Sequence, residues 1–115
     1  MEFIAQGDLK ITLREKSKSY RVLIKDISHI QSESYLSTIY FINDTKPIIV
    51  AKLLKKFEQE LSKYGFLRIC RNVLVNKVNV QVIHNNNSRK ISMVKNVELI
   101  ISCRNYARIN QILKK

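Results

Sequence analysis

Residues 66–76, FLRICRNVLVN, consist of two apolar runs separated by a polar pair, Arg71 and Asn72. Four apolar residues occupy alternate positions, as expected of a β-strand with one buried face: Leu67, Ile69, Val73 and Val75. Arg71 falls in the same alternation, on the side that should be apolar. This arginine therefore marks a bend between two strands, is a paired charge in the core, or is aimed at a partner.

The surrounding sequence favours a bend at Arg71. A buried arginine needs an ionic partner, and the nearest acid earlier in the sequence is Glu60, in the segment that we predict below to be a helix. We expect a turn between the two apolar runs, so that the Arg71 side chain leaves the core and faces a polyanion. Tertiary pairing with Glu33 or Glu98 is the alternative.

Strand signals continue on both sides of this segment. Three stretches each contain two β-type runs around a polar turn, which is the pattern of a hairpin. They are LKITLREKSKSYRVLI (9–24), STIYFINDTKPIIV (37–50) and NVQVIHNNNSRKISMV (79–94), and VELIIS (97–102) adds a further strand. The sequence therefore predicts one mostly β domain over residues 1–115, with about ten short strands in small sheets.

The hydrophobic period changes in AKLLKKFEQELSKYG, residues 51–65. Its apolar residues recur at helical spacing: Leu53, Leu54, Phe57 and Leu61. We predict an amphipathic helix at about residues 52–63, packed on a sheet and stopped by Gly65. The tail RNYARINQILKK predicts a short C-terminal helix that carries four bases: Arg104, Arg108, Lys114 and Lys115.

The charge is strongly positive and uneven. Lys and Arg number 21 against 9 Asp and Glu, a formal net charge of +12. Residues 61–115 contain eleven bases and one acid, Glu98, whereas residues 1–60 contain ten bases and eight acids. Such a basic half predicts a polyanionic partner, with nucleic acid ahead of an anionic membrane surface. Charge that serves only solubility is the other interpretation.

Membrane and secretory signals are missing from the sequence. No apolar run approaches the roughly 20 residues that a membrane span requires. The N-terminus MEFIAQGDLK lacks the basic-then-apolar order of a signal peptide. We therefore expect a cytoplasmic protein without a membrane partner, whose two cysteines, Cys70 and Cys103, are reduced thiols.

Catalytic and cofactor motifs are also missing. His29 and His84 lie in different predicted strands, and Gly7 and Gly65 stand alone, so no phosphate-binding glycine loop is present. No cluster of acids, histidines or cysteines has metal-ligand spacing. We expect a protein that is not an enzyme and holds no metal or cofactor.

Residues of the types that read bases follow the predicted strands. Arginine pairs bidentately with guanine and asparagine with adenine in the major groove. Four such residues lie in the basic half: Arg71, Asn72, Arg104 and Asn105. Arginine and asparagine also occur in ordinary loops. Each of these residues taken alone could therefore be a loop residue without a ligand.

The order of elements resembles the LytTR-type DNA-binding domain of bacterial transcription regulators. Three stretches carry the resemblance: DISHIQSESYLSTIYF, IIVAKLLKKFEQELSKYGFLRICRNVLVN and ISCRNYARINQIL. The second is the most specific, since Phe66, Arg68, Val75 and Asn76 match recurrent positions of the family. Two residues depart from the pattern: Cys70 stands where histidine is frequent, and Asn72 where serine is frequent, which leaves the base preference open.

The resemblance implies a β-rich domain that binds specific double-stranded DNA and regulates transcription. Such domains read the major groove with loops, bind promoter direct repeats as two copies, and bend the duplex. The resemblance assigns base reading to Ser37, Arg71 and Arg104. Backbone or supporting contacts fall to a larger set: Ser34, Tyr35, Asn72, Lys77, Arg89, Lys90, Asn105 and Arg108.

The chain contains no receiver or sensor domain of the kind that precedes this domain in response regulators. We expect either a stand-alone protein or the output half of a longer one. A small basic RNA-binding β domain is the alternative function, although the nine aromatic residues are scattered and form no RNA-binding motif.

Cys70 and Cys103 each adjoin a proposed reading arginine. Oxidation of both could act as a redox switch, and the competing interpretation is two small hydrophobic residues at strand ends.

Overall fold

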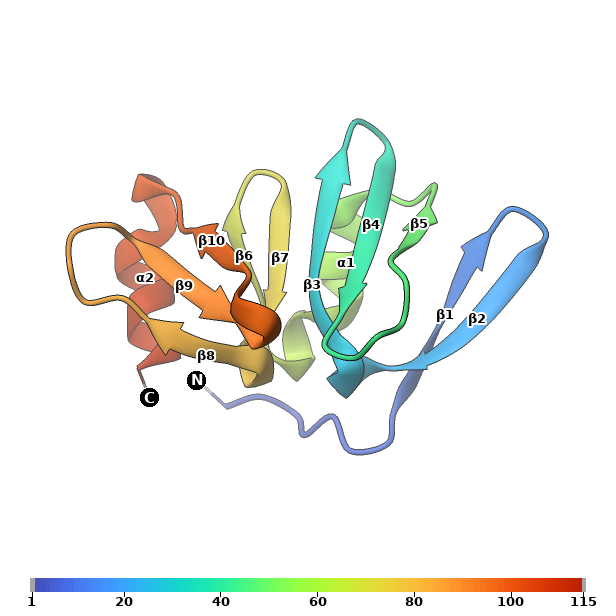
Figure 1. The fold of residues 1–115 in the computed structure, drawn as a ribbon, viewed down its shortest axis with the longest axis horizontal. Coiled ribbons are helices and arrows are strands. Elements are labelled where there is room, and N and C mark those ends of the chain that lie inside the picture. The colour runs from blue at the N-terminus through green and yellow to red at the C-terminus, as the bar shows by residue number, and fades with distance from the viewer. Residues whose placement is uncertain (1, 115) are drawn as a thin grey trace.

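The computed structural model describes residues 2–114, which form ten β-strands and two α-helices (Figure 1). The strands are β1 (Lys10–Glu15), β2 (Lys18–Leu23), β3 (Ile27–Glu33), β4 (Leu36–Phe41), β5 (Ile48–Val50), β6 (Phe66–Cys70), β7 (Val73–Asn76), β8 (Val80–Ile83), β9 (Lys90–Met93) and β10 (Glu98–Ile100). The helices are α1 (Leu54–Leu61) and α2 (Cys103–Leu113). Four 3-10 turns lie at Ile24–Asp26, Ser62–Tyr64, Lys77–Asn79 and Val94–Asn96. The predicted mostly β fold is confirmed.

The strands form three antiparallel sheets. The central sheet has the order β5-β4-β3-β7-β6, and the hairpin β1-β2 and the sheet β10-β9-β8 flank it on either side. All three predicted hairpins are present: β1 pairs with β2, β4 with β5, and β8 with β9. Polar turns at the expected places, such as Lys16-Ser17, reverse the chain.

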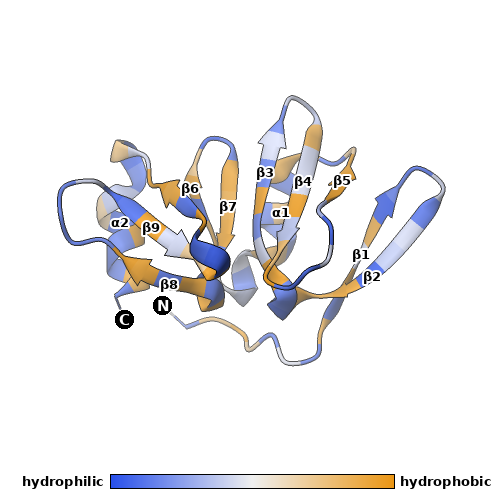
Figure 2. Ribbon diagram, in the orientation of Figure 1, coloured by the Kyte–Doolittle hydropathy of each residue, from blue (hydrophilic) through white to orange (hydrophobic). Residues whose placement is uncertain are grey.

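The turn predicted from FLRICRNVLVN is confirmed. Arg71 and Asn72 form it between β6 and β7, and both are exposed. Among residues 2–114, no carboxylate lies within ion-pair distance of Arg71, so pairing with Glu33 or Glu98 is not observed. Figure 2 shows this turn as hydrophilic at the end of the hydrophobic strand β7.

The expectation of one buried face on these strands was wrong, because both faces of β6 and β7 are covered. Phe66 and Leu74 pack into a core with α1. The opposite face packs into a second core under β9 and α2, through the four alternating residues Leu67, Ile69, Val73 and Val75. The residues that cover this face come from residues 80–113. The alternation within residues 66–76 therefore could not predict the second core.

Helix α1 is shorter than the predicted 52–63. Leu53 adopts an extended backbone (φ −67°, ψ 144°) and precedes the helix, and its side chain is 51% exposed instead of lying in the core. Leu54, Phe57 and Leu61 are buried as expected. Gly65 ends the segment with φ of 91°, a left-handed conformation that favours glycine, as predicted.

Helix α2 begins at Cys103 and confirms the predicted C-terminal helix. Ile109 and Leu113 bury its inner face, and Arg104 and Arg108 lie exposed on the outer face. Cys103 is exposed in the first helical turn and Cys70 is half-buried at the end of β6. Lys115, the last base of the tail, lies outside the described residues.

Candidate nucleic-acid interface

The predicted contact loops gather along one edge of the molecule. Figure 1 shows the β3–β4 and β6–β7 turns and the start of α2 on the upper edge, at the ends of their strands. Two backbone hydrogen bonds join these three segments. The Ser32 amide donates to the Asn72 carbonyl (2.8 Å), and the Ser102 amide donates to the Ile69 carbonyl (2.9 Å). The sheet therefore sets the spacing of the loops.

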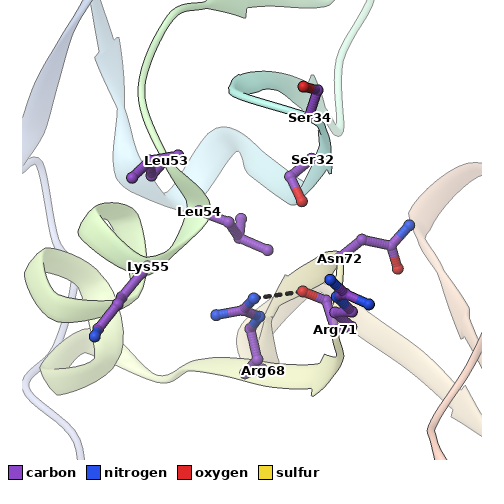
Figure 3. A pocket seen from close by; sticks show the side chains of 8 residues that line it. All are labelled: Ser32, Ser34, Leu53, Leu54, Lys55, Arg68, Arg71 and Asn72. Carbon is purple, nitrogen blue, oxygen red and sulfur yellow. Dashed lines mark hydrogen bonds between the residues drawn. The ribbon is translucent and has the colours of Figure 1, made fainter.

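Arg68 stabilises the β6–β7 turn through hydrogen bonds to its backbone. Its Nε donates to the Cys70 carbonyl (3.2 Å), and another guanidinium nitrogen donates to the Arg71 carbonyl (Figure 3). The same guanidinium pairs with Glu58 of α1 (2.9 Å). Charge-assisted hydrogen bonds to two successive carbonyls stabilise the backbone of the turn that carries Arg71.

The positioning role of Arg68 was not predicted from sequence, although one signal pointed to it. Arg68 has the opposite alternation to Leu67 and Ile69, so it must lie on the face of β6 that α1 covers. The partner could not be predicted, because Glu58 lies off the apolar stripe of the predicted helix and nothing in its spacing links it to Arg68.

A cleft of about 650 Å³ separates the two turns from the start of α1 (Figure 3). Its lining combines three cations, two hydroxyl groups, one amide and two leucines: Ser32, Ser34, Leu53, Leu54, Lys55, Arg68, Arg71 and Asn72. No acid is present among these residues, but Arg68 is already paired with Glu58, so Lys55 and Arg71 are the cations left for a ligand. Such a set of donors can hold phosphate oxygens or the acceptor atoms of a base edge.

The β3–β4 turn projects beside this cleft. Ser34 adopts φ of 59°, a left-handed conformation that is uncommon outside glycine, and Tyr35 is 74% exposed at the tip. Both residues are therefore accessible to a ligand on this edge, as their assignment to supporting contacts requires.

Ser37 does not fit its assignment to base reading. It lies within β4, not in the loop, and is 0% exposed. Its hydroxyl donates to the Lys52 carbonyl (2.5 Å), because Ser37 pairs with Val50 of β5 just before the chain turns into α1. A buried hydroxyl that is already bonded has no free donor or acceptor facing a base, which argues against base reading by Ser37. Ser37 positions the β5–α1 connection.

The start of α2 carries the third predicted contact. Arg104 is exposed in the first turn, and Arg108 lies four residues further on the same face. The Asn105 amide donates to the Ser102 hydroxyl (3.1 Å), so this half-buried asparagine stabilises the helix start.

The three remaining predicted contacts divide between two places. The Arg89 guanidinium donates to the Ile101 carbonyl (3.0 Å) and so lies beside the start of α2, with Lys90 next to it at the start of β9. Lys77 follows β7 at the end opposite to Arg71, and its backbone amide donates to the Gly65 carbonyl (3.0 Å). The structure therefore does not bring Lys77 to the edge that carries the other residues.

The two histidines lie in different parts of the fold, whereas Cys70 and Cys103 directly follow Ile69 and Ser102, the two residues that a backbone hydrogen bond joins. Burial lowers the pKa of His29 to about 4, and its ring stacks on Tyr40 with 4.6 Å between centroids. His84 contacts the Ser92 hydroxyl (3.0 Å) in another sheet. The Cys70 thiol contacts the Asn72 amide oxygen (3.2 Å). Within residues 2–114, no three metal-ligating side chains cluster, and neither helix is long and apolar enough to cross a membrane.

Comparisons with known proteins agree with this geometry. A family model described as LytTr DNA-binding domain matches residues 17–114. A similar solved structure is the LytTr DNA-binding domain of a methyl-accepting/DNA response regulator from Bacillus cereus. It superposes with a TM-score of 0.73 at 19% identity, covering 94% of this chain and 98% of that one, which shows a shared fold. No curated protein sequence matches significantly.

Proposed function

This chain belongs to the LytTr DNA-binding domain family, and from that premise we propose that it binds specific sequences in double-stranded DNA to regulate transcription. One observation carries the proposal: an exposed Arg71, whose turn is held by Arg68, lines a cleft with unpaired cations on the same edge as Arg104 at the start of α2. Major-groove recognition by loops fits this edge, because neither helix lies along it as a recognition helix would.

We assign base reading to Arg71 and Arg104, since each is exposed and each can pair bidentately with guanine. Ser34, Tyr35 and Asn72 would contact phosphate or sugar beside Arg71. Arg89, Lys90, Asn105 and Arg108 form the supporting group around the start of α2. Lys77 is left out of the interface, and Ser37 acts through the connection that it holds.

The wider assembly belongs to the same proposal. Two copies would bind direct repeats in a promoter, one helical turn apart, and bend the duplex between them. The residues form one DNA-binding domain of a cytoplasmic protein that has no catalytic activity, and a receiver domain would precede it in a longer regulator.

Substitutions at Arg104 and Lys90 test the division of roles. Arg104→Ala should reduce discrimination at one or two base pairs by about 1 to 3 kcal/mol, because only base contacts carry sequence information. Arg71→Ala should do the same at different base pairs. Lys90→Ala should instead weaken cognate and scrambled duplexes nearly equally. Titrations of each variant with both duplexes, at two salt concentrations, measure these changes.

Equal losses on cognate and scrambled duplex for Arg104→Ala would show that this arginine contacts only the backbone. Displacement of duplex DNA by single-stranded RNA would favour the RNA-binding alternative. RNA readers stack bases on exposed aromatic rings, whereas the Tyr40 ring on the sheet face already stacks on the buried His29.

A further inference from the structure

A second cleft, of about 950 Å³, lies between the β1–β2 hairpin and the start of α1. Four cations line it: Arg14, Lys16, Lys52 and Lys56. We propose that this cleft binds backbone phosphates of the DNA outside the bases that the loops read. The inference rests on the proposed function and extends the interface to a hairpin that contributes no base contact.

The charge of the hairpin supports this site. Residues 10–23 contain five bases and one acid, although residues 1–60 as a whole are close to balanced. The acid, Glu15, accepts a hydrogen bond from the Ile49 amide (3.1 Å) and is thereby held against β5. The hairpin is therefore a local concentration of positive charge.

Most of the cations in the cleft are not neutralised by carboxylates. Glu60 binds the Lys52 ammonium through both oxygens (2.8 Å each). Within residues 2–114, no carboxylate lies within ion-pair distance of Arg14, Lys16 or Lys56. Three charges are thus left for an anionic ligand, and a phosphodiester backbone offers one negative charge at each step.

The β1–β2 hairpin is packed against the first core along its strands, and its turn extends beyond the core. It forms its own two-stranded sheet, and Leu13 (2% exposed) anchors it in the first core, with Ile11, Tyr20 and Val22 packed beside it. Lys16 lies at the free tip, with φ of 55°. The tip can therefore reach a ligand while the strands behind it stay packed.

The tip also lies on the correct side of the molecule. Figure 1 shows the β1–β2 turn on the same edge as the β3–β4 and β6–β7 turns, at the end of the long axis opposite to α2. That axis is 44 Å long. At 3.4 Å per base pair, the edge spans about 13 base pairs, so the hairpin should contact the flank that lies away from Arg104.

Nucleic acid fits the cleft better than an acidic peptide with apolar anchors. Leu13, Val50 and Phe57 form its floor but are at most 5% exposed. Leu53 is left as the one exposed large apolar side chain in the lining. The accessible surface is therefore mainly cationic, and lysines act on phosphate as point charges without reading sequence.

The test compares duplexes of different length that contain the site selected by the wild-type domain. Lys16→Ala/Lys56→Ala should lower affinity for a duplex with long flanks about 10-fold and reduce the salt slope by about 2, one unit per phosphate contact. Shortening the flank away from Arg104 should cost the wild type a similar factor and cost this variant nothing. Shortening the other flank should affect both proteins equally.

Lys46→Ala is the control for loss of an exposed lysine elsewhere on the surface, because it removes one positive charge from a residue that lines a different cleft. It should retain the flank effect. Thermal unfolding should be unchanged in both variants, since the three lysines are exposed.

The inference is overturned if the wild type selects a site but gains nothing from the flank, or if the double variant loses equally on long and short duplexes. Binding of poly-glutamate that the double variant abolishes, without a flank effect, would also overturn it in favour of an acidic protein partner. If the wild type selects no duplex sequence at all, the proposed function itself fails, which is a distinguishable result.

Discussion

Replacing Asn76 with alanine is expected to lower the free energy of unfolding by about 3 kcal/mol, because the change removes a fully buried hydrogen-bonding group. Asn76 is 0% exposed at the end of β7. Its amide donates to the Ile27 carbonyl (2.9 Å) and the Ile24 carbonyl (3.3 Å). Its oxygen accepts from the Gln6 amide (2.7 Å). One side chain thus joins the N-terminal segment, the start of β3 and the strand that leads from the β6–β7 turn.

Urea denaturation of the wild type and the variant measures this loss. Asn72→Ala is the matched control, since Asn72 is exposed at the other end of the same strand, and its stability should change by no more than about 0.5 kcal/mol. A loss below about 1 kcal/mol for Asn76→Ala would mean that the hydrogen bonds are replaced by water and do not hold the fold together.

Acidification from pH 6.5 to pH 4 is expected to remove up to about 3 kcal/mol of stability through His29. Burial lowers the pKa of His29 from 6.5 to about 4 in the folded protein. As the pH falls below 6.5, the unfolded chain takes up a proton that the folded chain does not accept. The contribution of neutral His29 is therefore complete above pH 6.5 and is lost progressively down to pH 4.

His29→Phe separates this effect from the titration of carboxylates. Phenylalanine can keep the stacking on Tyr40 but cannot take up a proton, so the variant should lose less stability over the same pH range. Unfolding free energies of both proteins, measured at half-unit pH steps, give the difference. Parallel pH profiles would show that protonated His29 is accommodated in the fold.

The turn at Arg71 could be predicted because it depends on local information: an arginine in an apolar alternation with no acid nearby. The two-sided burial of β7 could not. The residues that cover its second face belong to β9 and α2, which follow later in the chain. Alternation indicates which side chains share a face, but it does not reveal how many layers will pack on the sheet.

In the candidate site too, local sequence information predicted some residues, whereas others depend on contacts that form only in the folded chain. Arg71 and Arg104 were found from residue type and position, and both are exposed on one edge. Base reading by Ser37 was expected from the family resemblance, whereas its register places it inside β4 against β5, where its hydroxyl is already bonded. Arg68 was missed because its partners are two carbonyls and Glu58, which come together only in the folded structure.

The most direct test of DNA reading by this edge is selection from a random pool of duplexes at near-physiological salt, followed by sequencing of the bound fraction. Sequence-specific binding predicts convergence on a short motif, with direct repeats about one helical turn apart, and relaxed selection by Arg71→Ala at the base pairs that this arginine contacts. Retention of DNA without convergence would contradict it, because the basic edge would then bind phosphate while the loops read no sequence.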